Sequence, residues 1–157
     1  MSRRSQITMS DAELEAFLAE ERVVTCASIG PNGRPHLMPL WYVALGKTIS
    51  SWTFAKSQKA KNLERLPQAT LQVEAGDGYL ELRGAMIECD VELIRDLVAV
   101  TAIGLALGVR YASAGGPAGP SLEREAAVAK QAPKRIGLRF HPTRIVTWDH
   151  RKLGTAY

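Results

Sequence analysis

The sequence has no long apolar run and few cysteines. Its longest uncharged stretch through the most apolar region, 97–109, has thirteen residues, whereas a membrane-spanning helix needs about twenty. The charged start Met1-Ser2-Arg3-Arg4 is not followed by the apolar segment of a secretory signal. The two cysteines, Cys26 and Cys89, lie far apart, without the spacing of metal ligands. These absences predict a cytoplasmic protein that contacts no membrane and keeps both cysteines as buried free thiols.

Familiar catalytic and metal-binding signatures are also lacking. The chain contains no Gly-x-Ser-x-Gly elbow, no paired-carboxylate signature and no Gly-x-Gly-x-x-Gly loop. Its three histidines, His36, His141 and His150, do not have the spacing of a zinc site, so no metal is expected. These patterns therefore identify no catalytic side chain.

The excess of positive charge is small. Twenty Lys and Arg against sixteen Asp and Glu leave a net charge of +4 on 157 residues. The basic residues are scattered apart from two clusters, 56–61 and 150–152. A nucleic-acid binder concentrates basic charge on one face and interleaves it with aromatic residues. Two compact clusters fit a localised anion such as a phosphate at least as well, so no nucleic-acid partner is expected.

What the sequence does contain is the composition of one globular domain. With 46% hydrophobic and 23% charged residues, disorder and collagen-like repeats are excluded. We expect an N-terminal tail over residues 1–9 and a single domain over 10–157. Within it, the Ala-, Gly- and Pro-rich segment 112–120 is expected to be a mobile loop.

Local patterns predict many strands and a few helices. Ser10 and Glu13 have the spacing of a capping box and start a helix over 11–21. Further helices are expected over 57–66, 90–109 (with Asp90 as cap) and 121–130. Short segments bounded by turns predict strands over 22–29, 34–44, 48–54, 69–74, 79–88, 135–140 and 144–148. Six or seven strands, mostly in hairpin order, indicate a mainly β fold, an antiparallel barrel with peripheral helices.

The most informative segment is 51–63, where a predicted strand ends and a helix begins with Ser57 near its N-cap. Lys56, Lys59 and Lys61 lie close together there. The free N–H groups and the dipole of a helix start attract an anion, whereas lysines at this end oppose the dipole. This conflict points to a bound phosphate. A solvated basic helix face explains the same charges equally well.

An ordered set of motifs over residues 10–153 resembles a known superfamily. The motifs are Ile29-Gly30-Pro31-Asn32-Gly33-Arg34-Pro35-His36-Leu37, then Pro39-Leu40-Trp41-Tyr42, and Ser57-x-Lys59-x-x-Asn62-Leu63 followed by Pro67. Together they resemble the split-barrel flavin and deazaflavin proteins of the pyridoxamine phosphate oxidase-like superfamily. Arg83-Gly84 and the closing Trp148-Asp149-His150-Arg151-Lys152-Leu153 resemble more specifically its deazaflavin-dependent reductase branch, which uses coenzyme F-420.

The resemblance implies a homodimeric FMN-binding split barrel with the cofactor site at the dimer interface. Lys59, with Ser57, Lys56 and Asn62, would hold the cofactor phosphate. The residues implied to lie beside the cofactor ring are Met38, Pro39, Leu40 and Trp41 on one strand, Trp52 and Thr53 on the next, and Tyr79 and Trp148 reaching the partner's cofactor. The three tryptophans also fit a simpler role as packing anchors.

The implied activity is hydride transfer between reduced F-420 and an unsaturated small-molecule acceptor. Pyridoxamine phosphate oxidation is not expected, because the chain ends with His150-Arg151-Lys152 rather than with an Arg-x-His motif. Two alternatives stay open: an FMN-dependent oxidoreductase, since the phosphate site suits either cofactor, and a non-catalytic F-420 carrier.

Overall fold

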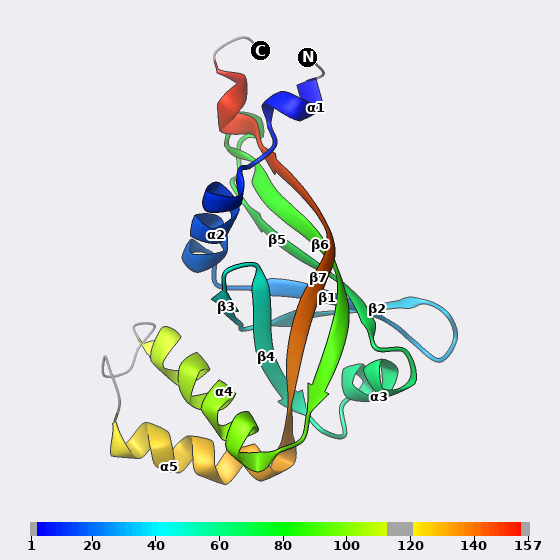
Figure 1. Cartoon of the computed structure of the whole chain (residues 1–157), viewed down its shortest axis with the longest axis vertical. Coiled ribbons are helices and arrows are strands. Elements are labelled where there is room, and N and C mark those ends of the chain that lie inside the picture. Colours follow the sequence, from blue (N-terminus) through cyan, green and yellow to red (C-terminus); the bar gives the residue numbers. More distant parts are fainter. Residues whose placement is uncertain (1–2, 113–120, 155–157) are drawn as a thin grey trace.

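The computed structural model describes residues 3–112 and 121–154. Seven antiparallel strands form one sheet in the order β2-β1-β5-β6-β7-β4-β3, which curls into a split barrel (Figure 1). The strands are β1 (Val24–Ile29), β2 (Pro35–Leu40), β3 (Val43–Leu45), β4 (Thr48–Phe54), β5 (Gln68–Ala75), β6 (Arg83–Ile94) and β7 (Arg135–Asp149). This architecture confirms the predicted mainly β fold with peripheral helices.

The helices lie around the sheet. They are α1 (Arg3–Gln6), α2 (Asp11–Glu20), α3 (Gln58–Arg65), α4 (Leu97–Arg110), α5 (Leu122–Gln131) and the 3-10 helices η1 (Tyr79–Glu81), η3 (Ala132–Lys134) and η4 (His150–Leu153). The capping box of α2 forms as predicted, because Ser10 accepts from Glu13 N and Glu13 accepts from Ser10 N. No helix in the described part of the chain is long and apolar enough to cross a membrane.

The final strand differs from the prediction. Segments 135–140 and 144–148 were expected as two strands, but β7 runs unbroken along β6. The register shifts between Glu88, which faces Arg144, and Cys89, which faces Pro142. This bulge leaves Thr143 without a paired residue and accommodates a proline that has no N–H to donate.

The start of the long helix was also placed wrongly. Asp90 belongs to β6, which continues to Ile94 because its residues pair with β7 and bury Val91 and Ile94. The cap of α4 is instead Asp96, whose carboxylate accepts a hydrogen bond from Ala99 N at 2.9 Å. Strand pairing and the burial of alternate side chains therefore keep this segment in β6, where the sequence predicted a helix.

Two other predicted strands differ in their bounds. Residues 79–81 form η1, so that β6 begins at Arg83. The expected strand 34–44 is divided into β2 and β3 at Trp41 and Tyr42. Tyr42 is fully buried, and its hydroxyl lies 2.8 Å from Leu18 O and 3.0 Å from Glu21 O. The chain bends because this ring is anchored beneath the end of α2.

The core has two parts. The larger part fills the barrel with apolar side chains from the strands, α2 and α3, and the smaller part joins α4 to the outer face of β4. The tail predicted over 1–9 is partly attached, since Met9 N donates to Thr147 Oγ1 and Asp149 N donates to Ile7 O. Most of the predicted loop 112–120 lies outside the described residues.

Candidate cofactor site

The start of α3 is built as the sequence predicts. Ser57 is its N-cap, in an extended conformation, and the Ser57 hydroxyl accepts a hydrogen bond from Ala60 N at 3.2 Å. Thr53, at the end of β4, lies with its hydroxyl 3.3 Å from that of Ser57. The junction is thereby fixed by side-chain hydroxyls that occupy part of the helix start.

Lys59 is the unusual residue of this junction. Its side chain is buried, with only 5% of the residue exposed. Burial lowers the pKa of Lys59, and the Cys26 thiol of β1 lies within electrostatic reach of its amino group. No ion pair or hydrogen bond satisfies this amino group within residues 3–112 and 121–154. A buried cation without a partner is costly, so the arrangement fits a site that receives an anion.

The other two lysines of the cluster are different. Lys56 and Lys61 are exposed. The reading of the cluster as a solvated basic face therefore describes these two residues and does not describe Lys59. Helical geometry explains the difference, because Lys59, Ala60 and Leu63 share the face of α3 that packs on the barrel.

Asn62 ties α3 to β1. It is fully buried, its amide nitrogen donates to Ser28 Oγ at 3.1 Å, and its amide oxygen accepts from Gln58 Nε2 at 2.8 Å. Opposite Ser28 stands His36 of β2, whose Nδ1 is buried without a hydrogen-bond partner among the described residues. Asn62 thus holds the helix in place, and the unsatisfied nitrogen of His36 lies on the residue that pairs with Ser28, the hydrogen-bond partner of Asn62.

The predicted ring-binding strand lies at an edge of the sheet. β2 pairs with β1 alone, and Met38 faces Cys26 across this pair. The outer main-chain groups of an edge strand are left without strand partners. In an antiparallel pair only every second residue directs its N–H and C=O outward, and Trp41 O already accepts from Ser51 Oγ at 2.7 Å, so only the outward main-chain groups of residues 38–40 can meet the polar edge of a flat ring.

Four of the predicted residues line one cavity of about 480 Å³ on the outer side of β4. Its lining comprises Pro39, Leu40, Trp41, Trp52, Gly104, Leu107, Gly108, Val128 and Arg135. Trp41 is further held by Tyr111, since the two rings stack at 4.4 Å and 3°. The volume falls within the range of about 300–1,000 Å³ that is usual for small-molecule sites.

Neighbouring residues of β4 do not share this cavity. Trp52 faces α4, whereas Thr53 is buried on the barrel side. Successive side chains of a strand point to opposite faces, so Trp52 and Thr53 do not line one surface as the sequence interpretation expected. Thr53 instead belongs with Ser57 at the start of α3.

Tyr79 and Trp148 lie at the other end of the molecule. Tyr79 is in η1, where its ring contacts His150, and Trp148 packs against Gly84 near the end of β7. The thirteen residue steps of β7 from Arg135 to Trp148 span roughly 40 Å. Within one chain they cannot join the other predicted residues, and their expected role requires a second copy.

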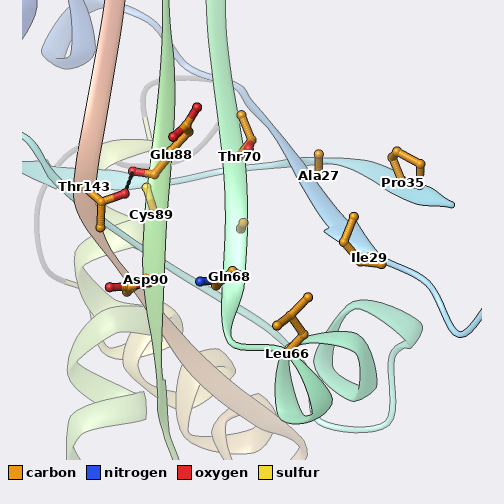
Figure 2. Close-up of a pocket in the computed structure, with 11 residues that line it drawn as sticks. Ala27, Ile29, Pro35, Leu66, Gln68, Thr70, Glu88, Cys89, Asp90 and Thr143 are labelled. Carbon is orange, nitrogen blue, oxygen red and sulfur yellow. Dashed lines mark hydrogen bonds between the residues drawn. The ribbon is translucent and has the colours of Figure 1, made fainter. Parts of the chain in front are cut away.

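A second concavity of about 380 Å³ lies between β1, β5 and β6. Figure 2 shows Glu88 and Asp90 on its β6 side and apolar residues such as Ile29 and Leu66 opposite. None of the predicted site residues lines this concavity. Its two carboxylates disfavour an anion, so it is not a candidate for the phosphate site.

Arg135 is the charged residue among the five lining residues of this cavity that the sequence interpretation missed. Its guanidinium carbon lies 4.9 Å from the centre of the Trp52 ring and 3.8 Å from that of Phe54. An arginine at the start of a strand carries no local signal of such a role. The contact follows from the register between β4 and β7, which places Arg135 opposite Phe54.

The fold is a seven-stranded antiparallel split barrel, and a buried lysine lies beside a helix start. These two features place the chain among the split-barrel proteins with an oxidoreductase-type fold. The sequence matches the profile of the pyridoxamine 5'-phosphate oxidase family over residues 10–149. The chain therefore belongs to the pyridoxamine 5'-phosphate oxidase family. No curated protein matches the chain significantly.

Solved structures share this fold. A conserved hypothetical protein of Mycobacterium tuberculosis is 38% identical, with a TM-score of 0.88, over 100% of this chain and 95% of that one. An F-420 reductase is 22% identical, with a TM-score of 0.62, over 83% of this chain and 94% of its own. An FAD-binding protein of Mesorhizobium loti is 17% identical, with a TM-score of 0.63, over 89% of this chain and 94% of its own. The latter two show the fold alone.

Proposed function

We propose that the protein is an oxidoreductase that binds the deazaflavin coenzyme F-420 and uses it to reduce an unsaturated small molecule. The observation that carries the proposal is the buried side chain of Lys59 next to the start of α3, whose amino group has no hydrogen-bond or ion-pair partner among the described residues. The likeness of fold to an F-420 reductase and the motif resemblance support the choice of a deazaflavin.

The residues divide the work of binding. Lys59, with Ser57 at the same helix start, holds the phosphate by charge and hydrogen bonds, and the exposed Lys56 adds charge from the solvent side. The main chain of Met38 to Trp41 orients the ring system, and the cavity beside Trp41 and Trp52 receives the acceptor. When bound, the reduced coenzyme supplies the hydride, and the protein supplies orientation and exclusion of water.

The completed site is proposed to need two copies of the chain. Trp148 and the Tyr79–His150 contact lie roughly 40 Å along β7 from its Arg135 end, too far from Lys59 to act on the same cofactor within one chain. In a homodimer they would approach the partner's cofactor. The proposed partners are therefore a second copy and a small-molecule acceptor.

A flavin is the competing cofactor, because a site for a phosphate does not distinguish FMN from F-420 and an FAD-binding protein shares the fold. Titration of the purified protein with each cofactor, followed by quenching of tryptophan fluorescence, decides between them. We expect saturable F-420 binding and weak FMN binding. The reverse preference would assign the protein to flavin chemistry, and no binding of either would overturn the proposal.

A matched pair of variants tests the phosphate site. Lys59→Met should weaken F-420 binding by about tenfold or more, as expected for loss of a charge-assisted hydrogen bond. Lys61→Met removes an equal charge from the exposed side of the same helix and should leave the affinity almost unchanged. Turnover of reduced F-420 with a panel of acceptors then separates a reductase from a carrier that only binds the coenzyme.

A further inference from the structure

Arg135 occupies an unusual place for a charged side chain. It begins β7, next to η3, and its guanidinium lies against the rings of both Trp52 and Phe54. These rings belong to the same face of β4, since they are two residues apart on one strand. Stacking on aromatic faces restricts a planar guanidinium to a defined orientation. Arg135 is thereby held as a preorganised cation rather than a freely moving surface charge.

This cation lacks the partners that arginine usually finds. Its Nε is buried without a hydrogen-bond partner, and no described carboxylate forms an ion pair with it. Burial lowers the pKa of Arg135, and no neighbouring acid offsets that effect. A buried donor without a hydrogen-bond partner destabilises the folded protein. The Nε of Arg135 therefore lowers the stability of the folded chain.

The surroundings of Arg135 are a ligand-sized cavity. Trp41, Leu107 and Val128 supply apolar walls, and Arg135 is the one charged residue among the described residues of the lining. On the α4 side, Gly104 and Gly108 contribute no side chain of their own; Trp52 and Val128 lie close to Gly104, and Arg124 lies close to Gly108. An apolar cavity with a single oriented cation selects for a flat apolar molecule that carries one negative group.

We propose that the cavity between β4, β7 and α4 is the acceptor subsite and that Arg135 selects acceptors bearing a carboxylate attached to an apolar, preferably aromatic, body. That the bound molecule is the hydride acceptor rests on the proposed reductase function. The anion site itself rests on the cavity and on the Arg135 guanidinium, which has no described ion-pair partner. The carboxylate would accept hydrogen bonds from the guanidinium while the body packs against Trp41 and Leu107. Arg135 is thus a specificity-determining residue.

The test compares an acid with a neutral molecule of the same shape. Binding of trans-cinnamate and of trans-cinnamamide to the purified protein is measured by calorimetry without cofactor. We expect the wild type to prefer cinnamate by roughly tenfold or more and Arg135→Met to lose the preference. Lys134→Met, which removes a neighbouring exposed charge, should keep it. Cinnamate preference retained in Arg135→Met, or absent from the wild type, overturns the inference.

A second variant covers the case in which Arg135→Met does not fold. Arg135→Lys keeps the charge but loses the planar pair of donors, so the preference for cinnamate should fall by several-fold without disappearing. An undiminished preference in a folded Arg135→Lys protein contradicts the assignment. Circular dichroism and thermal melting establish that each variant is folded before binding is compared.

F-420 titrations separate this inference from the proposed function. A carboxylate of the cofactor itself is the other source of the same chemistry. If Arg135→Met weakens F-420 binding and leaves the preference for cinnamate intact, Arg135 serves the cofactor and the acceptor assignment is wrong. If the wild type binds no F-420 but loses its cinnamate preference in Arg135→Met, the anion site stands and the reductase proposal fails.

Discussion

Lys59 carries opposite consequences for stability and for binding. Burial lowers its pKa, so the unfolded chain holds this proton more tightly than the folded chain does. Between the lowered pKa and the usual lysine value, the unfolded state binds more protons, and stability therefore rises with pH. At neutral pH the folded protein bears the whole unfavourable contribution of a buried charge. An anion that pairs with Lys59 would relieve it.

The first prediction follows from this conflict. Lys59→Met should stabilise the cofactor-free protein at pH 7 by about 1–3 kcal/mol, because it removes an unsatisfied buried group. The difference from the wild type should shrink as the pH is raised from 7 towards about 10.4, the usual lysine pKa, because the lowered pKa of Lys59 makes the wild-type lysine lose its proton below that value. Urea unfolding at both pH values measures this. A variant that is less stable than the wild type at pH 7 would show that the amino group has a partner in the folded protein.

The two cysteines give a second prediction at this scale. Burial raises the pKa of Cys26 to about 11 and that of Cys89 to about 12. Because the unfolded thiols ionise near pH 8.5, the stability contribution of both is present below that pH and is lost as the pH rises towards 11–12.

At pH 8 the folded protein should therefore react with a disulfide reagent at least about a hundredfold more slowly than the urea-unfolded chain, since the thiolate is the reactive form. Absorbance of the released thiol measures both rates. Rapid labelling of one equivalent in the folded protein would contradict the burial of that thiol.

At the scale of elements, two glycines of α4 meet different neighbours. A Cβ on Gly104 would lie 2.4 Å from Trp52 Cζ3, within the rigid indole, whereas a Cβ on Gly108 would meet the flexible side chain of Arg124. Alanine is favoured over glycine in a helix by about 1 kcal/mol. The side chain that the new Cβ would meet therefore decides whether each glycine-to-alanine substitution stabilises or destabilises the protein.

The third prediction compares these positions. Gly104→Ala should destabilise the protein by about 1–3 kcal/mol, because it displaces Trp52 or moves α4 away from β4. Gly108→Ala should be neutral or stabilising by up to about 1 kcal/mol. Urea unfolding followed by tryptophan fluorescence measures both. Equal effects at the two positions would mean that α4 does not pack closely on Trp52.

Local signals predicted the elements whose ends are marked by short-range chemistry. The capping box of α2 and the Ser57 cap of α3 are examples, because their hydrogen bonds join residues three positions apart. The start of α4 was missed because Asp90 and Asp96 are equally good caps locally. Pairing with β7, more than forty residues away, decides between them. The unbroken course of β7 past Pro142 depends on the same long-range pairing.

The site shows the same division. A phosphate site at Ser57 and Lys59 could be proposed from spacing alone, since both residues belong to one helix start. The burial of Lys59 and the exposure of Lys61 depend on how α3 packs. Arg135 could not be found from its neighbours in sequence, because its aromatic partners lie on β4, about eighty positions earlier.

At the scale of the whole molecule, the sheet has two edges, β2 and β3. Pro35 and Pro39 deprive β2 of two donors, so its edge is poorly suited to pairing with another strand. Its face is different. Leu37 is 58% exposed and pairs with Ala27, which lines the concavity of Figure 2 together with the apolar Ile29 and Leu66. A second copy is expected to cover this apolar face, which the proposed homodimeric site also requires.

The fourth prediction tests that expectation. Light scattering after size exclusion should give the wild type twice the chain mass of 17.1 kDa. Leu37→Glu should give the mass of one chain, because a charge buried without a partner opposes association. Leu45→Glu introduces the same charge at the other edge of the sheet, where Leu45 is 87% exposed, and should remain dimeric. If the wild type is a monomer, or if Leu37→Glu still dimerises, this face is not the interface. F-420 binding by a folded Leu37→Glu monomer then measures how much of the site one chain provides.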